Sequence, residues 1–87
     1  MTDHLVAKTD QYETLLEAAL EEATPLDGTG EECLEMASAY LDDGRHFRSQ
    51  DDDVTALAAF SYGHGWLDAG ARCGVLSVPE AGDLFAI

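Results

Sequence analysis

The feature that most constrains the fold of this chain is a run of 22 residues, 54–75, that carries almost no charge. Within it lie one acid, Asp68, and one base, Arg72, whereas residues 1–53 hold 15 of the 18 acids of the chain. A helix of this length can span a bilayer, but charged side chains at bilayer depth are costly. We therefore expect no membrane segment, and instead a helix that the rest of the protein buries on more than one side.

The composition indicates a folded acidic protein. The chain has 87 residues, a formal net charge of −14 and 46% hydrophobic residues, which is too apolar for a disordered chain. This length allows one domain, residues 1–87. A domain of this size buries only roughly 60–65% of its unfolded surface, so the monomer is marginal. With 4 Lys or Arg residues, the chain is poorly suited to bind phosphates, and we expect no nucleic-acid partner.

The kind of acidity favours a salt-rich environment. Asp is slightly commoner than Glu, and Lys8 is the single lysine. Charge of one sign destabilises a compact protein at low salt, and molar salt screens that repulsion because the Debye length falls to about 3 Å. We expect a salt-adapted protein, as in halophilic archaea, with an ordinary acidic protein as the alternative.

The cysteines and the N-terminus favour a cytoplasmic protein. Cys33 and Cys73 match neither a zinc spacing nor a disulfide framework. The N-terminal residues lack the basic and apolar regions of a signal peptide. We expect both cysteines to be buried, reduced thiols, although a helical hairpin would bring them toward the same end of the fold.

Three helices are predicted, at about residues 3–23, 30–49 and 54–75. Thr29 and Glu32 form a capping-box pattern at the start of the second helix. The three aspartates that precede the third helix can cap it and complement its positive end.

The first two helices each show one apolar face at helical spacing. In the first helix this face consists of Leu5, Thr9, Tyr12, Leu16, Ala19, Leu20 and Ala23. In the second helix the narrower apolar stripe consists of Cys33, Met36, Ala37, Tyr40, Gly44 and Phe47.

The third helix differs because its bulky residues form two stripes. One stripe contains Leu57, Phe60, His64 and Leu67, and the other contains Tyr62, Trp66 and Cys73. Glycines at positions 63, 70 and 74 weaken a helix, and close approach of a neighbouring element would offset that cost. Two partner helices cannot easily cover both stripes. We therefore expect residues 78–87 or a second copy of the protein to pack on this helix, and we favour a homo-oligomer.

The longest distinctive segment is VTALAAFSYGHGWLDAGAR at residues 54–72, preceded by Met36, Ala37 and the sequence YLDDG at residues 40–44. Over about residues 30–76, and in the first helix only in pattern, the chain resembles a family of small archaeal proteins known as domain of unknown function 357. The resemblance implies a compact all-helical bundle built on a long antiparallel hairpin. It implies no known catalytic activity, and no catalytic or binding residue is carried over from it.

His64 and Asp68 are the strongest candidates for chemistry. They lie four residues apart, so their side chains can meet on adjacent turns of one helix as a metal-binding or acid–base pair. A metal site needs three or four ligands, and the sequence assigns no third one. In the structural interpretation, which we favour, His64 is a hydrogen-bonded core residue and Asp68 pairs with Arg72.

Tyr62 and Trp66 are candidates for contact with a ligand or a protein. Four residues apart, they can stack on a ligand ring or form an interface hot spot. Core packing against the other helices is the favoured interpretation, because large aromatic side chains dominate core burial.

These observations predict an all-α protein, a three-helix bundle built on a long antiparallel hairpin with a short C-terminal appendage. The favoured function is a non-enzymatic protein-interaction or assembly module that uses the third helix. The alternatives are a metal-dependent or acid–base enzyme centred on His64 and Asp68, or a small-ligand binder that uses Tyr62 and Trp66. We expect no catalytic residue, no metal and no cofactor.

Overall fold

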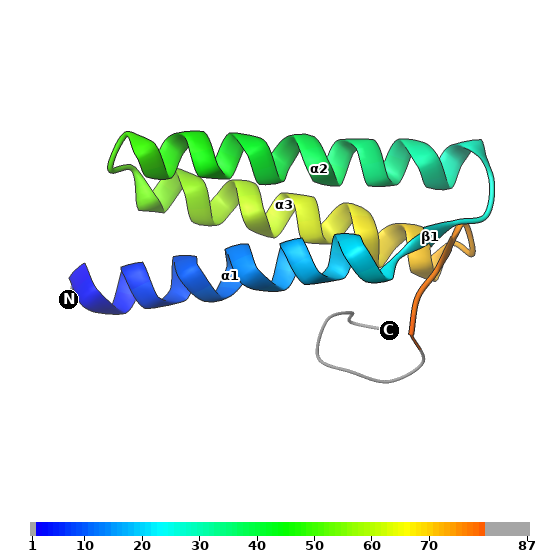
Figure 1. Cartoon of the computed structure of the whole chain (residues 1–87), viewed down its shortest axis with the longest axis horizontal. Coiled ribbons are helices and arrows are strands. Elements are labelled where there is room, and N and C mark those ends of the chain that lie inside the picture. Colours follow the sequence, from blue (N-terminus) through cyan, green and yellow to red (C-terminus); the bar gives the residue numbers. More distant parts are fainter. Residues whose placement is uncertain (1, 80–87) are drawn as a thin grey trace.

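The computed structural model describes residues 2–79, with side chains from residue 4, and three long helices dominate it (Figure 1). The elements in order are α1 (Thr2–Glu22), β1 (Thr24–Pro25), α2 (Gly28–Ser49), α3 (Asp53–Arg72) and β2 (Leu76–Ser77). Helices α1 and α3 run in one direction, and α2 runs in the opposite direction. The bundle measures 40 × 23 × 16 Å. The predicted fold, three helices built on an antiparallel hairpin with a short appendage, is confirmed.

Helix α2 begins earlier than predicted because a different residue caps it. The Oδ1 atom of Asp27 accepts a hydrogen bond from the backbone N–H of Gly30 at 2.9 Å. This bond satisfies one of the N–H groups that lack a partner at the start of a helix, so Gly28 and Thr29 become helical. The predicted capping box, with Thr29 outside the helix, is therefore wrong.

Both ends of α3 are set by local hydrogen bonds. At its start, the Asp52 side chain accepts a bond from the N–H of Thr55 at 3.2 Å, as the run of aspartates predicted. At its end, Gly74 adopts a φ of +79°, and the N–H of Val75 donates to the Gly70 carbonyl at 3.0 Å. This pairing is a Schellman motif, which ends the helix at Arg72 and not at residue 75 as predicted.

The predicted apolar face of α1 packs against the other two helices, mainly α3. Leu16 and Ala19 are fully buried, and the hydroxyl of the equally buried Thr9 donates to the Leu5 carbonyl at 2.8 Å. Tyr12 lies at the edge of this face and is 37% exposed. The helical spacing therefore identified the correct side of α1.

The core side of α2 is rotated from the predicted stripe. Cys33 and Ala37 are buried as expected, but Leu41, which the stripe left out, is buried, and Met36 is 37% exposed. The physical reason is that α2 contacts both α3 and α1, so its buried surface extends around the helix toward α1. The predicted stripe lies toward the α3 edge of that surface.

The three helices meet most closely at Gly63 of α3. A Cβ atom at this position would lie 2.8 Å from Leu16 Cδ2 on α1, 3.0 Å from Tyr40 Cβ and 3.2 Å from the carbonyl oxygen of Ala37 on α2. The close approach of both neighbours confirms the role predicted for this glycine. Phe60 and Leu67 flank it as the largest buried side chains of α3.

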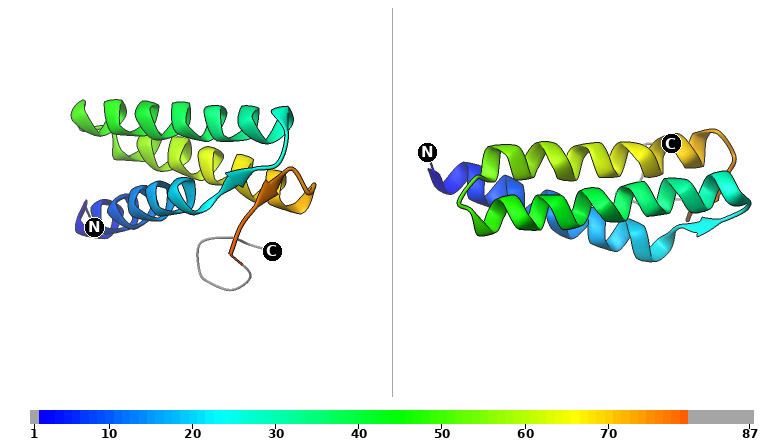
Figure 2. Two further views of the ribbon diagram at one scale, coloured as in Figure 1. Left: turned by 45° about the vertical axis from the view of Figure 1, so that its right-hand side comes forward. Right: turned by 90° about the horizontal axis from the view of Figure 1, so that it is seen from above.

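A two-residue antiparallel ladder closes one end of the bundle. Thr24 pairs with Ser77 and Pro25 with Leu76, so the α1–α2 connection is tied to the segment after α3 (Figure 2). The N–H of Leu26 extends this contact by donating to the Val75 carbonyl at 2.9 Å. No strand was predicted here, because two residues carry no periodic signal.

Both cysteines are free thiols, and they differ in exposure. Cys33 is buried, whereas Cys73, at the C-terminal cap of α3, is exposed, so the prediction of two buried thiols is wrong for Cys73. Burial raises the pKa of the Cys33 thiol, and the nearby Cys73 raises it further.

Within residues 2–79, no helix is both long and apolar enough to cross a membrane. The predicted cover of α3 by residues 78–87 concerns mainly residues 80–87, which lie outside the described part of the chain.

Candidate functional site

The predicted site residues all lie on α3, but they do not converge on one site. Tyr62 and Trp66 lie on the side of the helix that borders α2, whereas His64 and Asp68 lie on another side. Arg72 is exposed in the last turn. The five residues therefore divide into an aromatic pair, a His–Asp pair and a terminal arginine.

The aromatic pair is exposed. Tyr62 is 65% exposed and Trp66 is 39% exposed, so the prediction that they belong to the core is wrong. The core side of α3 is occupied by Phe60, Leu67 and small residues, and the two partner helices cover only that side. Tyr62 instead contacts Tyr40 of α2, with ring centroids 5.9 Å apart and the ring planes inclined at 51°.

Between residues 54 and 69, before the exposed Arg72, the exposed positions of α3 carry no charged residue, and we call this surface the uncharged face. From residue 54 to residue 69 the exposed positions are Val54, Thr55, Ala58, Ser61, Tyr62, Gly65, Trp66 and Ala69. Val54 is 67% exposed, which extends the apolar character to the start of the helix. Exposed aromatic and aliphatic side chains that gather on one face indicate a contact site.

The His64–Asp68 pair has the geometry of a loose ion pair. His64 Nε2 lies 3.8 Å from Asp68 Oδ1, and the two side chains are 20% and 29% exposed. This separation exceeds hydrogen-bond distance, so the pair as it stands does not form the tight donor–acceptor contact of an acid–base relay. Among the residues that the structure describes, no group of three or more His, Cys, Asp or Glu could hold a metal ion.

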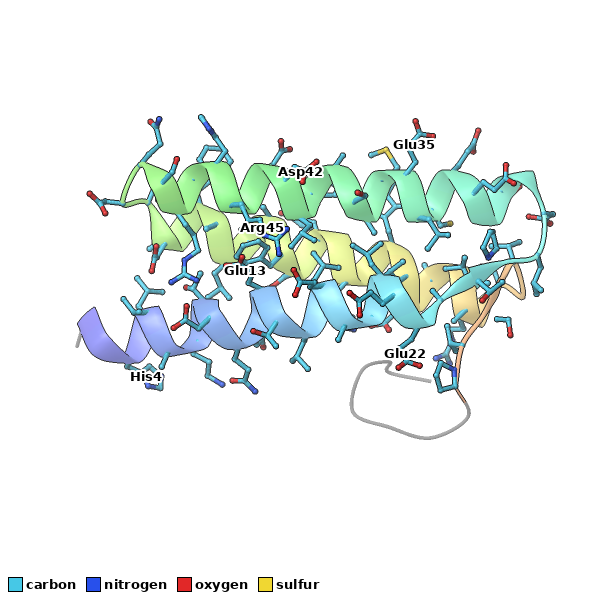
Figure 3. All side chains as sticks on the ribbon, in the orientation of Figure 1. His4, Glu13, Glu22, Glu35, Asp42 and Arg45 are labelled. Carbon is cyan, nitrogen blue, oxygen red and sulfur yellow. The ribbon has the colours of Figure 1, made fainter. Side chains whose placement is uncertain are left out.

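Sequence reasoning missed a cluster of ion pairs between α1 and α2. Arg45 Nε lies 2.8 Å from Glu13 Oε2, and the same guanidinium also contacts Glu17. Arg48 Nη1 lies 2.5 Å from Asp10 Oδ1 and 3.0 Å from Glu13 Oε1. Figure 3 shows Arg45 and Glu13 pointing toward one another from the two helices.

A third helix joins this cluster, because Arg48 Nε lies 3.7 Å from Asp53 Oδ1 at the start of α3. Partial burial alone would raise the pKa of Glu13, but the hydrogen bonds from Arg45 and Arg48 outweigh it and lower that pKa. The bonds to Glu13 and Glu17 raise the pKa of Arg45 in turn.

The signal for this cluster was present in the sequence. Asp10, Glu13 and Glu17 form an acidic stripe at spacings of three and four residues, and Arg45 and Arg48 form a short basic stripe three apart. Two such stripes face each other when their helices pack side by side. Arg45 and Arg48, two of the chain's 4 Lys or Arg residues, are thus paired with acids of the same chain. They do not form a basic surface for an acidic partner.

Over residues 2–79 the protein is thus a small acidic helical bundle, and exposed aromatic side chains lie on an uncharged face of its third helix. The family described as "Protein of unknown function (DUF357)" matches residues 11–76, which is most of the chain. This protein therefore belongs to the DUF357 family, which confirms the resemblance seen in the sequence and extends it into α1. The comparisons with curated proteins and with solved structures each found no match.

Proposed function

We propose that this protein is a non-enzymatic protein-interaction module that binds its partner through the uncharged face of α3. The observation that carries the proposal is the exposure of Tyr62 and Trp66, 65% and 39%, on a helix face without charge. Tyrosine and tryptophan contribute more binding energy at protein interfaces than other residues, because they bury large surfaces with little loss of side-chain freedom.

The α2 side of the face adds to the proposed contact surface. Tyr40 packs against Tyr62, and Met36 is 37% exposed on the same helix. Methionine adapts its shape to a partner, and aromatic rings supply rigid anchors. Together these side chains fit a contact with an apolar helix or strand better than the capture of a small polar molecule.

An enzyme centred on His64 and Asp68 has weaker support. The pair supplies two of the three or four ligands that a metal site requires. The 3.8 Å between His64 Nε2 and Asp68 Oδ1 is also too long for a hydrogen bond through which an acid–base pair would pass a proton. We infer that these residues have a structural role. The sequence favoured such a role, with His64 in the core and Asp68 paired with Arg72, whereas the contact seen here joins His64 and Asp68.

We also propose that the protein works in a salt-rich cytoplasm. The net charge of −14 resides mainly in residues 1–53, and therefore on α1, α2 and the turn before α3. Screening of this charge by salt favours the folded state.

Capture from an extract of the source cells at high salt, with surface variants, tests the interaction. The tagged wild-type chain, a Tyr62→Ser/Trp66→Ser variant and a Glu35→Gln/Asp42→Gln variant are compared. Glu35 and Asp42 lie on the outer side of α2 (Figure 3), so the last variant is a control on another surface. We expect one stoichiometric partner that the first variant loses and the control retains. Equal capture by all three proteins, or by none, contradicts the proposal.

A further inference from the structure

We propose that the partner of the uncharged face is a second copy of this chain, so that α3 packs on α3 of the copy about a two-fold axis near Gly65. This inference rests on the proposed function, because it names the occupant of the same contact surface. It is carried by the distribution of charge over the bundle and by the residues at the centre of the face.

The distribution of charge over the protein favours a second copy of the chain as the partner. The exposed positions of α1 and α2 carry most of the acids, so two copies that met through those helices would place carboxylates against carboxylates. From residue 54 to residue 69, the exposed positions of α3 carry none, and Asp68, the acid within this range, is 29% exposed and pairs with His64. In an isologous dimer each copy presents the same surface to the other, so a surface with an excess of one charge would repel itself. The uncharged face carries no such excess.

A basic partner would meet a different surface. Lysine and arginine side chains are attracted to the acidic outer sides of α1 and α2, where the carboxylates lie. The uncharged face offers them no counter-charge. The absence of acids on this one face of a protein with a net charge of −14 therefore favours an apolar, uncharged partner surface such as its own.

Gly65 marks the centre of the proposed contact. A Cβ atom added there would meet nothing within 4 Å, so no contact within the chain requires a glycine at this position. At Gly63 and Gly70 the situation is opposite, because a Cβ atom would lie 2.8 Å from Leu16 and 2.6 Å from Leu76, respectively. Glycine weakens a helix, and close approach of a helix from another molecule explains why it stands at position 65.

The surroundings of Gly65 fit a close helix–helix contact. Ala58, Ser61 and Ala69 lie on the same exposed side of α3, and their small side chains permit two helix backbones to approach. Tyr62 and Trp66 flank the centre and supply the buried area that small residues cannot.

The association should strengthen with salt. Each copy brings a net charge of −14, and the Debye length falls from about 10 Å at 0.1 M to about 3 Å at 1 M salt. Long-range repulsion between the acidic helices is then screened, whereas the apolar contact is not weakened. We expect at least a tenfold lower dimer dissociation constant in 2 M KCl than in 0.1 M KCl.

Sedimentation equilibrium of the full chain in 2 M KCl tests the inference, with two variants matched in charge. Gly65→Glu places a carboxylate at the centre of the face, and Gly28→Glu places one at the start of α2, where an added Cβ also meets nothing within 4 Å. We expect a dimer for the wild type and for Gly28→Glu, and at least a tenfold weaker dimer for Gly65→Glu. Circular dichroism checks that both variants keep the helical content of the wild type.

Disulfide cross-linking tests the position of the axis. Gly65→Cys and Gly28→Cys are each combined with Cys73→Ser, which removes the exposed native thiol, and are oxidised in air with a copper catalyst. We expect covalent dimers for Gly65→Cys in high yield and for Gly28→Cys only at the background level. Equal yields for the two proteins contradict a two-fold axis near Gly65.

The outcomes separate this inference from the proposed function. A wild-type protein that sediments as a monomer at every salt and protein concentration contradicts the proposal that the partner is a second copy. If the same protein still captures a partner that Tyr62→Ser/Trp66→Ser loses, the interaction module stands with a different occupant. If it captures none, both proposals are wrong.

Discussion

The seam between α2 and α3 and the seam between α1 and α2 are built in different ways. The α2–α3 seam is apolar and close: a Cβ atom added at Gly44 would overlap the Phe60 ring, and one added at Gly63 would overlap atoms of α1 and α2. The α1–α2 seam contains the ion pairs of Arg45 and Arg48 with acids of α1. Packing therefore joins the α2–α3 hairpin, and charge helps to align α1 on it.

Loss of the largest core side chain should give the largest effect. Phe60→Ala removes a ring that is 1% exposed and leaves a cavity between α2 and α3. We expect a loss of about 3–5 kcal/mol in the free energy of unfolding, which is a large part of the stability of a domain this small. Urea denaturation in 2 M KCl measures it. Leu26→Ala, at a position that is 60% exposed and lies outside the uncharged face, is the control and should change stability by less than about 0.5 kcal/mol. A small effect of Phe60→Ala would show that the hairpin seam is not the main source of stability.

Two glycines only two residues apart on α3, one buried and one exposed, should respond in opposite directions to the same substitution. Gly63→Ala inserts a methyl group 3.0 Å from Tyr40 Cβ, and the strain should destabilise the fold by about 1–3 kcal/mol. Gly65→Ala meets no atom within 4 Å, and its better helix propensity should stabilise the monomer by up to about 1 kcal/mol. Thermal unfolding at low protein concentration measures both. Stability changes of the same sign in the two variants would contradict the close packing at Gly63.

Removal of an arginine tests the charged seam. Arg48 contacts Asp10, Glu13 and Asp53, and Arg45 contacts Glu13 and Glu17. We expect Arg48→Ala to cost about 1 kcal/mol and Arg45→Ala less, because the Arg48 side chain is 23% exposed and that of Arg45 is 42% exposed.

The salt dependence separates charge from packing in this seam. The cost of Arg48→Ala should shrink between 0.1 M and 1 M KCl because salt screens the ion pairs, whereas the cost of Phe60→Ala should not. An Arg48→Ala cost that does not change with salt would indicate that the arginine acts through its aliphatic stem.

Protonation of Glu13 at low pH should give the smallest of these effects on stability. The folded-state pKa of Glu13 is lowered below its ordinary value of 4.5 by the two arginines, against the opposing effect of burial. A depressed pKa contributes stability that is present above pH 4.5 and is lost as the pH falls toward the folded-state value. In Glu13→Gln this part of the pH dependence should disappear. Denaturation curves between pH 6 and pH 3 for the wild type and the variant measure the difference, and superimposable profiles would contradict the pairing.

The sequence predicted the helices well and the exposed surfaces less well. The spacing of Thr9, Leu16 and Ala19 placed the buried side of α1 correctly because only one side of that helix is apolar. The spacing in α3 was ambiguous, since both of its stripes contain bulky apolar residues. Nothing in a single-chain pattern states which stripe a neighbour covers, so Tyr62 and Trp66 were assigned to the core and proved exposed.

The predicted helix ends were less accurate because neighbouring residues offer competing signals for where a helix begins or ends. Asp27 and Thr29 are both good N-terminal caps, and the choice between them depends on where α2 meets the end of the bundle. Gly30 packs against the backbone of Val75 there, which fixes the first turn of α2 in the core. Gly74 was correctly singled out, but its positive φ makes it the terminator of α3 and not a site of close packing.

The sequence by itself determined that this chain is helical, acidic and apolar in its third helix, because spacing, charge and helix-terminating residues are local properties. The tertiary structure decided which side of each helix is buried, that Arg45 and Arg48 pair with acids of α1, and that an uncharged face of α3 remains exposed. These properties depend on the rotation and distance of helices that lie far apart in the sequence. A repeat of 3.6 residues defines a face, and only a neighbour in space determines what covers it.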